Sequence, residues 1–201
     1  MLELVGEPDP RSTVRRRYEE AQWWYAVGKQ MLNAEWQLRK AKAVGAHPVV
    51  LGRPRIDATD LVVGDNFAVW SAHRQTLITG WGRIRFGDRC FVNSGTIVVS
   101  ACEVTIGDDV ALANEVYVMD SDSHGVEGRP VREEPVRIGA GTWVGARAII
   151  LPGVTIGRRC LIAAGTVVSR DFGDDLLIAG NPAREIRPLV YPEGVVRAWH
   201  N

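Results

Sequence analysis

Aliphatic residues recur every six positions in the second half of the chain. The clearest run contains six of them: Ile138, Val144, Ile150, Ile156, Ile162 and Val168. The residue directly after each is mostly small, and the residue four positions after each is mostly small or β-branched. A six-residue period fits neither an amphipathic helix nor a hairpin meander. It predicts a short strand followed by a tight corner.

The same period recurs earlier in the chain. The members of these runs are Phe86, Val92 and Val98 and then, after a slip of two residues, Ile106, Leu112 and Val118. Val63 and Val69 begin the pattern weakly, and residues 75–85 do not fit it. If three strand-and-corner units close one turn, each coil takes about 18 residues, and the aliphatic side chains stack inside a triangular prism.

Residues 12–42 have the composition of a helix instead. Pro8 and Pro10 break the backbone before this stretch, and Ser12 is a suitable N-cap. Its apolar stripe consists of Val14, Tyr18, Ala21, Tyr25 and Leu32. We expect the stripe to pack on the prism or on a neighbouring subunit. The alternative is peripheral contact with a membrane surface or an acceptor, through Arg15, Arg16 and Arg17 with Trp23 and Trp24.

These patterns divide the chain into three parts. We expect an N-terminal helical segment at residues 1–48, a β-helix domain at 49–187 with a loop at 119–137, and a C-terminal tail at 188–201. With 201 residues, 46% of them hydrophobic, the chain has room for one domain with a substantial core.

Charge and cysteine content narrow the function classes. The 24 Lys and Arg balance the 24 Asp and Glu, which gives no overall attraction to nucleic acid. No apolar run has the length of a membrane span. The three cysteines indicate a reducing cytoplasm. Cys90, Cys102 and Cys160 each lie four residues after a repeat position, so we expect buried small residues, with neither a metal site nor a nucleophile among them.

A polar stretch interrupts the repeat between Val118 and Ile138. Their separation of 20 exceeds the roughly 18 residues of one coil by about two, which predicts a loop that leaves the prism. The loop contains His124, whose imidazole suits a general base at neutral pH; the alternative is a solvated histidine. The sequence does not decide which nearby acid would orient it: Asp120, Asp122, Glu127, Glu133 or Glu134.

The chain resembles the hexapeptide-repeat acyltransferases, and most closely their maltose/galactoside O-acetyltransferase branch. Two blocks carry this resemblance: Ile106–Gly125, and Val136–Ile186 with its terminal GNPA. Residues 49–56, VVLGRPRI, resemble the entry to the prism in the subgroup that acylates glycans and glycoconjugates. The resemblance implies a mainly β fold, a left-handed parallel β-helix. It also implies a homotrimer with acetyl-CoA in the grooves between adjacent prisms.

The resemblance also assigns roles to residues. It implies that His124 is the catalytic base and that Asn93 contacts the acceptor, although a turn asparagine explains Asn93 equally well. For acetyl-CoA it implies Ala146 and Ala164 along the pantetheine, and Ser169, Arg170 and Arg184 near the nucleotide. The alternative for the two alanines is ordinary close packing, and the alternative for the two arginines is a solvated surface charge. Trp143 either covers the groove or plugs a corner of the prism.

The function that follows is a cytoplasmic, metal-free, CoA-dependent O-acyltransferase acting on a hydroxyl of a sugar, glycan or glycolipid precursor. Three alternatives stay open. The acceptor is instead an amino group of an amino sugar or antibiotic, or the prism is a non-catalytic scaffold, or it holds zinc as in the carbonic anhydrases with this fold. The zinc enzymes need three histidines, and only His73 and His124 fall within the predicted prism.

Overall fold

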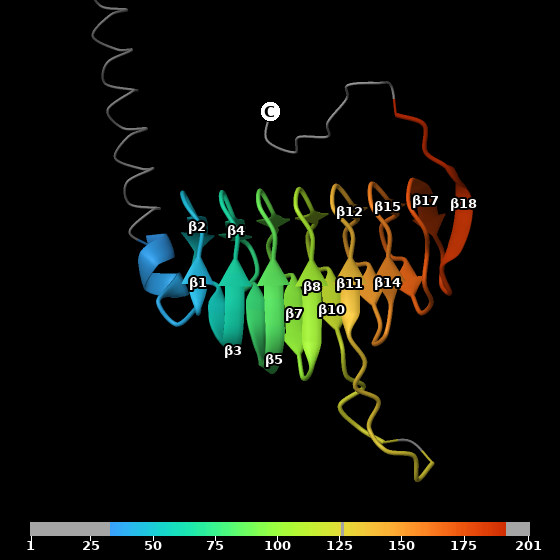
Figure 1. Cartoon of the computed structure of the whole chain (residues 1–201), viewed down its shortest axis with the longest axis horizontal. Helices are drawn as coiled ribbons and strands as arrows, with labels where there is room; N and C mark the ends of the chain where they lie inside the picture. Colours follow the sequence, from blue (N-terminus) through green and yellow to red (C-terminus); the bar gives the residue numbers. More distant parts are fainter. Residues whose placement is uncertain (1–32, 126, 192–201) are drawn as a thin grey trace, which may run out of the picture.

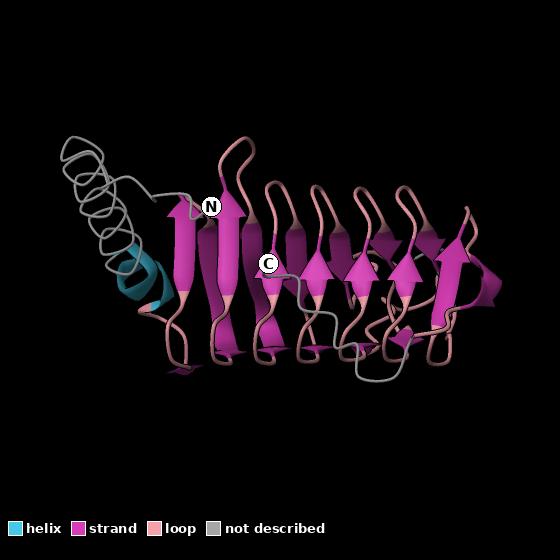
Figure 2. Ribbon diagram, turned by 90° about the horizontal axis from the view of Figure 1, so that it is seen from above, coloured by secondary structure: helices cyan, strands magenta, loops and turns pink. Residues whose placement is uncertain are grey.

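The computed structural model describes residues 33–125 and 127–191, and they form a parallel β-helix (Figures 1 and 2). Its coils stack along the long axis of the molecule, with successive strands hydrogen-bonded in parallel. The mainly β fold predicted from the six-residue period is therefore confirmed. Most of the predicted helix, with its apolar stripe and its arginine and tryptophan group, lies outside the described residues.

The prism has three faces. Face A contains β1 (Ala43–Val44), β8 (Glu103–Ile106), β11 (Val136–Ile138) and β14 (Thr155–Ile156). Face B contains β7 (Ile97–Ser100), β10 (Tyr117–Met119), β13 (Ile149–Ile150) and β16 (Val167–Val168). Face C contains β2 (Val49–Gly52), β4 (Ala68–Ser71), β6 (Phe91–Val92), β9 (Ala111–Leu112), β12 (Trp143–Val144), β15 (Leu161–Ile162) and β17 (Leu176–Ala179). Two long strands, β3 (Arg55–Val63) and β5 (Leu77–Phe86), run around the corner from face B to face A. The last strand, β18 (Arg184–Pro188), pairs antiparallel with β17.

The repeat residues form columns inside the prism. On face C the column consists of Val50, Val69, Val92, Leu112, Val144, Ile162 and Ile178, all fully buried. Burying one such side chain contributes about 1.5–3 kcal/mol. The six-residue period of aliphatic residues in the sequence therefore arises because each of them points into the interior of the prism.

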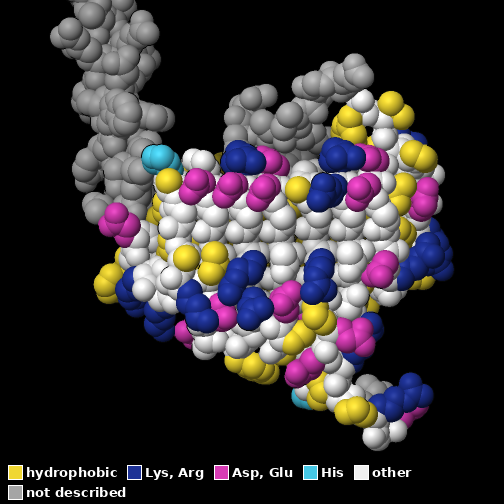
Figure 3. Space-filling model, in the orientation of Figure 1, with side chains coloured by type: hydrophobic (Ala, Val, Ile, Leu, Met, Phe, Trp, Pro, Cys, Tyr) yellow, Lys and Arg dark blue, Asp and Glu magenta, His cyan; other side chains and the backbone are white. Residues whose placement is uncertain are grey.

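The A–C edge, where face A turns into face C, is regular in every coil. The inward residues on its two sides are always six apart, as in Val63 and Val69 or Ile156 and Ile162. An aspartate at the corner often accepts the backbone N–H of the preceding coil's corner, as Asp88 does from Asp65 at 2.9 Å and Asp108 from Asp88 at 2.9 Å. Figure 3 shows acidic side chains in a row along one edge of the molecule.

The A–B edge varies, and it explains the irregularities of the sequence pattern. Face A strands such as β8 bury two residues, Val104 and Ile106, which accounts for the slip of two positions. Residues 75–85 do not fit the period because β5 continues through this corner. At Gly80, with φ +132°, an added Cβ would lie only 2.0 Å from the Ser100 carbonyl oxygen, so no larger residue fits.

The loop at this edge is longer than the sequence arithmetic suggested. Val118 pairs within face B, with Val98 and Ile150, whereas Ile138 pairs within face A, with Ile106. The two residues are therefore on successive faces, where the equivalent residues are eight apart in the preceding coil, Val98 and Ile106, and six apart in the next. The excess of two residues that we expected was wrong, because it assumed one complete coil. The insertion is about twelve to fourteen residues long, and it projects from the prism in Figure 1.

Both ends of the prism are covered. Residues 33–38 are helical, and Ala34 and Leu38 are buried against the first coil. The Asn33 amide holds this segment by donating to the Val50 carbonyl at 2.8 Å and the Gly52 carbonyl at 3.1 Å. At the opposite end β18 covers the last coil. Among the described residues no helix is long and apolar enough to cross a membrane.

The outward side chains differ from face to face. On face B the central outward row consists of Leu77, Ile97, Tyr117, Ile149 and Val167. On face C the corresponding row consists of Val49, Ala68, Phe91, Ala111, Trp143, Leu161 and Leu177. All these side chains are apolar, although Arg55 pairs in register with Leu77 on the first coil of face B. The outward positions of face A are mostly charged or polar.

Candidate active site

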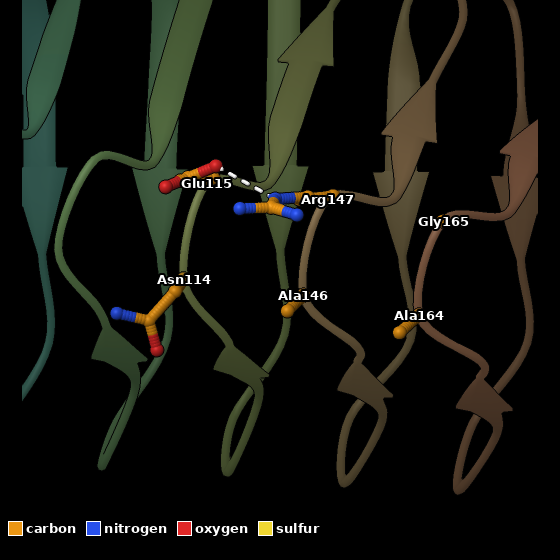
Figure 4. A pocket seen from close by; sticks show the side chains of 6 residues that line it. All are labelled: Asn114, Glu115, Ala146, Arg147, Ala164 and Gly165. Atoms are coloured by element: carbon orange, nitrogen blue, oxygen red, sulfur yellow. Dashed lines mark hydrogen bonds and ion pairs between the residues drawn. The ribbon is translucent and has the colours of Figure 1, made fainter.

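A groove follows the B–C edge, where each coil turns from face C to face B. Ala146 and Ala164 occupy equivalent places on successive coils in this groove (Figure 4). The two coils are joined here because the Gly165 N–H donates to the Ala146 carbonyl at 2.8 Å. The groove has a volume of about 400 Å³ and is open to solvent. The structure thus brings together the two alanines that the sequence analysis assigned to the pantetheine.

The rim of this groove carries an ion pair that the sequence analysis did not identify. The Arg147 Nε donates to Glu115 Oε2 at 2.8 Å (Figure 4). Arg74 Nε lies 3.5 Å from the other oxygen of this carboxylate. The hydrogen bond from Arg147 lowers the pKa of Glu115 below its ordinary value. Both Glu115 and Arg147 have positive φ, at a corner position where Gly95 and Gly165 stand in other coils. The sequence could have indicated this ion pair, because charged residues stand at a corner position that other coils fill with glycine.

Arg184 lies at the C-terminal end of the same edge. The Ala183 N–H donates to the Val167 carbonyl at 2.9 Å, so the segment after Gly180 folds back over the last coils. Arg184 begins β18 with an exposed side chain, whose Nη1 donates to the Ala183 carbonyl at 2.8 Å. The end of the groove therefore presents a cation to an anionic ligand.

Ser169 and Arg170 lie elsewhere. They follow β16 at the A–B edge, on the opposite side of face B from the groove. Both side chains are exposed, and the Arg170 guanidinium lies 4.9 Å from the centre of the Phe172 ring. A single chain therefore does not place this pair next to Ala146 and Ala164.

Asn93 is on the B–C edge, two coils before Ala146. It follows β6, is half-buried, and donates its backbone N–H to the Leu112 carbonyl at 2.9 Å. Its side-chain Oδ1 accepts the Ser94 N–H at 2.8 Å, and its carbonyl accepts from Thr76 Oγ1 at 3.2 Å. These bonds hold Asn93 in a defined turn on the same edge as the groove.

His124 lies on the projecting loop, which leaves the prism at the A–B edge. The base of the loop is a short antiparallel pairing, with a bridge between Ser121 and Glu133 and a hydrogen bond from the Asp122 N–H to the Arg132 carbonyl at 3.0 Å. His124 is exposed. In the described part of the chain, none of the five acidic residues named as orienting candidates contacts its ring. The structure therefore places the predicted base on the edge opposite the groove.

Asp120 has a different role from the one considered for it. It is fully buried at the start of the loop, where its carboxylate accepts Ser100 Oγ–H and the Ala101 N–H, each at 2.6 Å, and the Cys102 N–H at 3.0 Å. Its own carbonyl accepts the Glu134 N–H at 2.9 Å. Asp120 therefore ties the first residue of the loop, and through Glu134 the last ones, to the corner of the preceding coil.

The three cysteines and Trp143 lie outside the groove-lining set. Cys90 and Cys160 are buried as expected, and burial raises the pKa of Cys90 to about 12. Cys102 is only half-buried, which corrects the expectation for it, because it lies at the corner after β7 and does not face the interior. Trp143 points outward on face C and is 38% exposed, so it does not plug the interior. Among the described residues no three metal-ligating side chains gather.

Comparisons with known proteins agree with this architecture. The family model described as bacterial transferase hexapeptide (six repeats) matches residues 135–170. The galactoside O-acetyltransferase of Escherichia coli (strain K12) is 34% identical over 116 residues, which are 53% of this chain and 54% of that protein.

Solved structures show the same fold. The maltose O-acetyltransferase from Clostridium difficile 630 superimposes with a TM-score of 0.56 at 27% identity, over 76% of this chain and 72% of that one. A galactoside acetyltransferase in complex with coenzyme A gives a TM-score of 0.53 at 25% identity, over 76% and 68% of the two chains.

The chain spans little more than half the length of the curated relatives it matches, 57% and 54% for two of them. The part that matches the family model contains the coils that carry Ala146 and Ala164. Residues 135–170 therefore match the hexapeptide repeat of bacterial transferases, and the chain is similar in sequence and in fold to these acetyltransferases.

Proposed function

We propose that the protein is an O-acyltransferase that moves an acetyl group from acetyl-CoA to a hydroxyl of a sugar, glycan or glycolipid precursor. The observation that carries this proposal is the groove on the B–C edge. There Ala146 and Ala164 form a narrow track of small side chains on two successive coils, and Arg184 lies at its end. The galactoside acetyltransferase solved with coenzyme A, which has the same fold, supports the choice of donor.

The dimensions and charges of the groove suit this donor. Small side chains leave room for the slender pantetheine arm, since a Cβ built on Gly165 meets nothing within 4 Å. The cation of Arg184 suits the phosphates at the other end of CoA, which arginine can contact at two points. Arg147, although paired with Glu115, adds a second cation beside the track.

The proposed active site needs two copies of the chain. The A–B edge carries His124, Ser169 and Arg170, whereas the B–C edge carries Asn93 and the alanine track, and face B separates the two edges. Packing the A–B edge of one copy against the B–C edge of the next brings both sets into one groove. Three copies joined head to tail close a ring, which is the homotrimer that we propose. The apolar outward rows of faces B and C supply surface for such contacts.

In this site His124 is the general base. Its neutral imidazole takes the proton of the acceptor hydroxyl as that oxygen attacks the thioester carbonyl of the donor. The carbon–sulfur bond then breaks, and the sulfur leaves as the CoA thiol after receiving the proton from the imidazolium. Asn93, fixed in its turn, positions the acceptor. We place this chemistry in the cytoplasm because the donor is a CoA ester and the three cysteines are unpaired.

The test replaces two exposed histidines by the same residue. His124→Asn should lower kcat by about 10²- to 10⁴-fold, the usual contribution of a general base. CoA affinity should stay unchanged, because the proposed donor contacts lie outside the loop. His47→Asn is the matched control, since His47 is exposed on the A–C edge and already has the positive φ that asparagine tolerates.

Turnover, melting temperature and CoA binding are measured on the same preparations. In the wild type kcat/KM should rise with pH as the imidazole loses its proton and then level off. Turnover of His124→Asn within a few-fold of the wild type would show that another group is the base.

A further inference from the structure

A second hollow lies at the N-terminal end of the B–C edge, and the proposed mechanism does not use it. It has a volume of about 370 Å³, within the range of small-molecule sites. Four cationic side chains line it: Arg39, Lys40, Arg53 and Arg55. Among the described residues that line it Asp57 is the one carboxylate, so these residues carry three more positive than negative charges.

The cations of the hollow are only partly neutralised. Lys40 Nζ lies 3.2 Å from Asp57 Oδ1, and Arg55 Nη2 lies 3.9 Å from the other oxygen of the same carboxylate. The Arg39 side chain donates to the Trp36 carbonyl at 2.6 Å, and its guanidinium lies 4.0 Å over the Trp36 ring. Arg53 is exposed and has no ion pair within the described residues. Positive charges that neighbouring carboxylates do not fully compensate attract an anion.

The hollow is built from fixed parts of the fold. The Asn33 amide ties the helical residues to the Val50 and Gly52 carbonyls, directly before Arg53. On the next coil Gln75 Nε2 donates to the Arg53 carbonyl at 3.3 Å. The exposed indole of Trp36 adds an apolar wall. A sugar phosphate needs this combination, namely cations for its phosphate and an apolar surface for its ring.

The position of the hollow links it to the acyl-transfer site. Gly52 to Pro54, the corner of the first coil, and Asn93 to Gly95, the corner of the third, lie on the same B–C edge. Adjacent strands are about 4.8 Å apart, so two coils separate the hollow from Asn93 by roughly 10 Å. Along this edge the groove for the donor lies on one side of Asn93, and the cationic hollow lies on the other.

We propose that this hollow binds the phosphate of a phosphorylated saccharide acceptor, whose reacting hydroxyl then lies at Asn93. This inference rests on the function proposed above and names its substrate class. A phosphate ester carries up to two negative charges and three terminal oxygens, enough to engage more than one cation of the hollow. The separation from Asn93 selects acceptors longer than one sugar ring.

The test compares maltose with maltose 1-phosphate as the probes. Binding is measured by calorimetry at saturating CoA, which fills the donor groove and its cations first. The wild type should bind maltose 1-phosphate at least 10-fold more tightly than maltose. Arg53→Gln should lose most of this preference, since a charge-assisted hydrogen bond contributes a factor of about 10 to 100 in affinity. Its affinity for maltose should not change.

Arg158→Gln is the control for charge alone. Arg158 is exposed on the A–C edge, and replacing it removes the same charge from a distant corner. Its preference for maltose 1-phosphate should stay within two-fold of the wild type. Equal binding of the two probes by the wild type, or equal losses in both variants, would overturn the inference.

Transfer assays separate this inference from the proposed function. If maltose 1-phosphate binds through Arg53 but neither probe accepts an acetyl group, the proposed function fails and the anion site stands. If maltose is acetylated and the phosphate gives no gain in affinity or in kcat/KM, the proposed function stands and the inference fails.

Discussion

Face A and face B are built from the same repeat and bury the same kind of residues, yet their outer surfaces have little in common. On face A, Arg85 Nη2 lies 2.7 Å from Asp60 Oδ1, and Arg137 Nη2 lies 3.0 Å from Glu103 Oε1. Figure 3 shows acidic and basic side chains interspersed over this face. The central outward row of face B begins with Arg55 on β3, but from Leu77 onward it contains no charge over five coils.

The contrast between the two outer surfaces indicates what surrounds each face in the working protein. The fold dictates only the inward residues, because those must pack; the outward residues are free to suit their surroundings. A flat apolar sheet surface invites association, whereas interspersed charges keep a surface solvated. Face A is thus suited to water, and face B, like face C, is suited to protein contact. The two edges that carry the predicted site residues both border face B.

The largest effect should come from placing a charge on face B. Ile97→Glu puts a carboxylate in the centre of its apolar row, and burying an unpaired charge in a contact costs several kcal/mol. We expect the proposed trimer to dissociate to monomers at micromolar concentration in light scattering, and acetyl transfer to be lost with it. The fold should persist in circular dichroism, because the side chain points away from the interior.

Thr105→Glu supplies the matched control on face A. Thr105 lies between Arg85 and Arg137 in the outward row, where a carboxylate finds partners. Its assembly and activity should equal those of the wild type. If Ile97→Glu remains a trimer while Thr105→Glu dissociates, the assignment of the two faces is reversed.

A smaller effect is expected at the border between the two faces, where the loop begins. Asp120→Ala removes the acceptor of the Ser100 hydroxyl and of two backbone N–H groups. Each buried group left unpaired costs about 1–3 kcal/mol, so the free energy of unfolding should fall by about 3 kcal/mol or more. The kcat should fall as well, because the residue that holds the base of the loop of His124 is gone.

Asp122→Ala tests whether any acid in this loop has the same effect. Asp122 is exposed, and its described hydrogen bond is made by its backbone. Its stability should stay within about 0.5 kcal/mol of the wild type in urea unfolding. Equal losses in the two variants would mean that the buried carboxylate does not hold the loop.

The interior was predictable from the sequence because close packing admits few residue types. Every column position on face C is aliphatic, and the run from Ile138 to Val168 gave the period directly. The A–B edge was less predictable, since a corner open to solvent accepts extra residues. The length of the loop was underestimated for this reason, although its presence was expected from the break after Val118.

The site was predictable only in part. Resemblance indicated Ala146 and Ala164, which the structure places together, but no spacing rule links Glu115 to Arg147. These two residues are 32 positions apart, and they meet because the insertion between them leaves the stacking of the coils intact. Asp120 was considered as a partner of His124 because sequence proximity does not show that a carboxylate is buried. The roles of His124, Asn93 and the arginines remain predictions.

The smallest effect is expected on face A itself, at Asp60. Hydrogen bonds from Lys42 and then Arg85 lower the pKa of this carboxyl below its ordinary 3.8. A group whose pKa is lower in the folded than in the unfolded protein stabilises the fold above the unfolded pKa. That contribution is lost as the pH falls through the folded pKa. Asp60→Asn should therefore be slightly less stable than the wild type at pH 5 to 7, and the difference in melting temperature should shrink below about pH 4. High salt at neutral pH should shrink it too, because these ion pairs are near the surface. A difference in melting temperature that grows on acidification would mean that face A depends on its charges for more than contact with water.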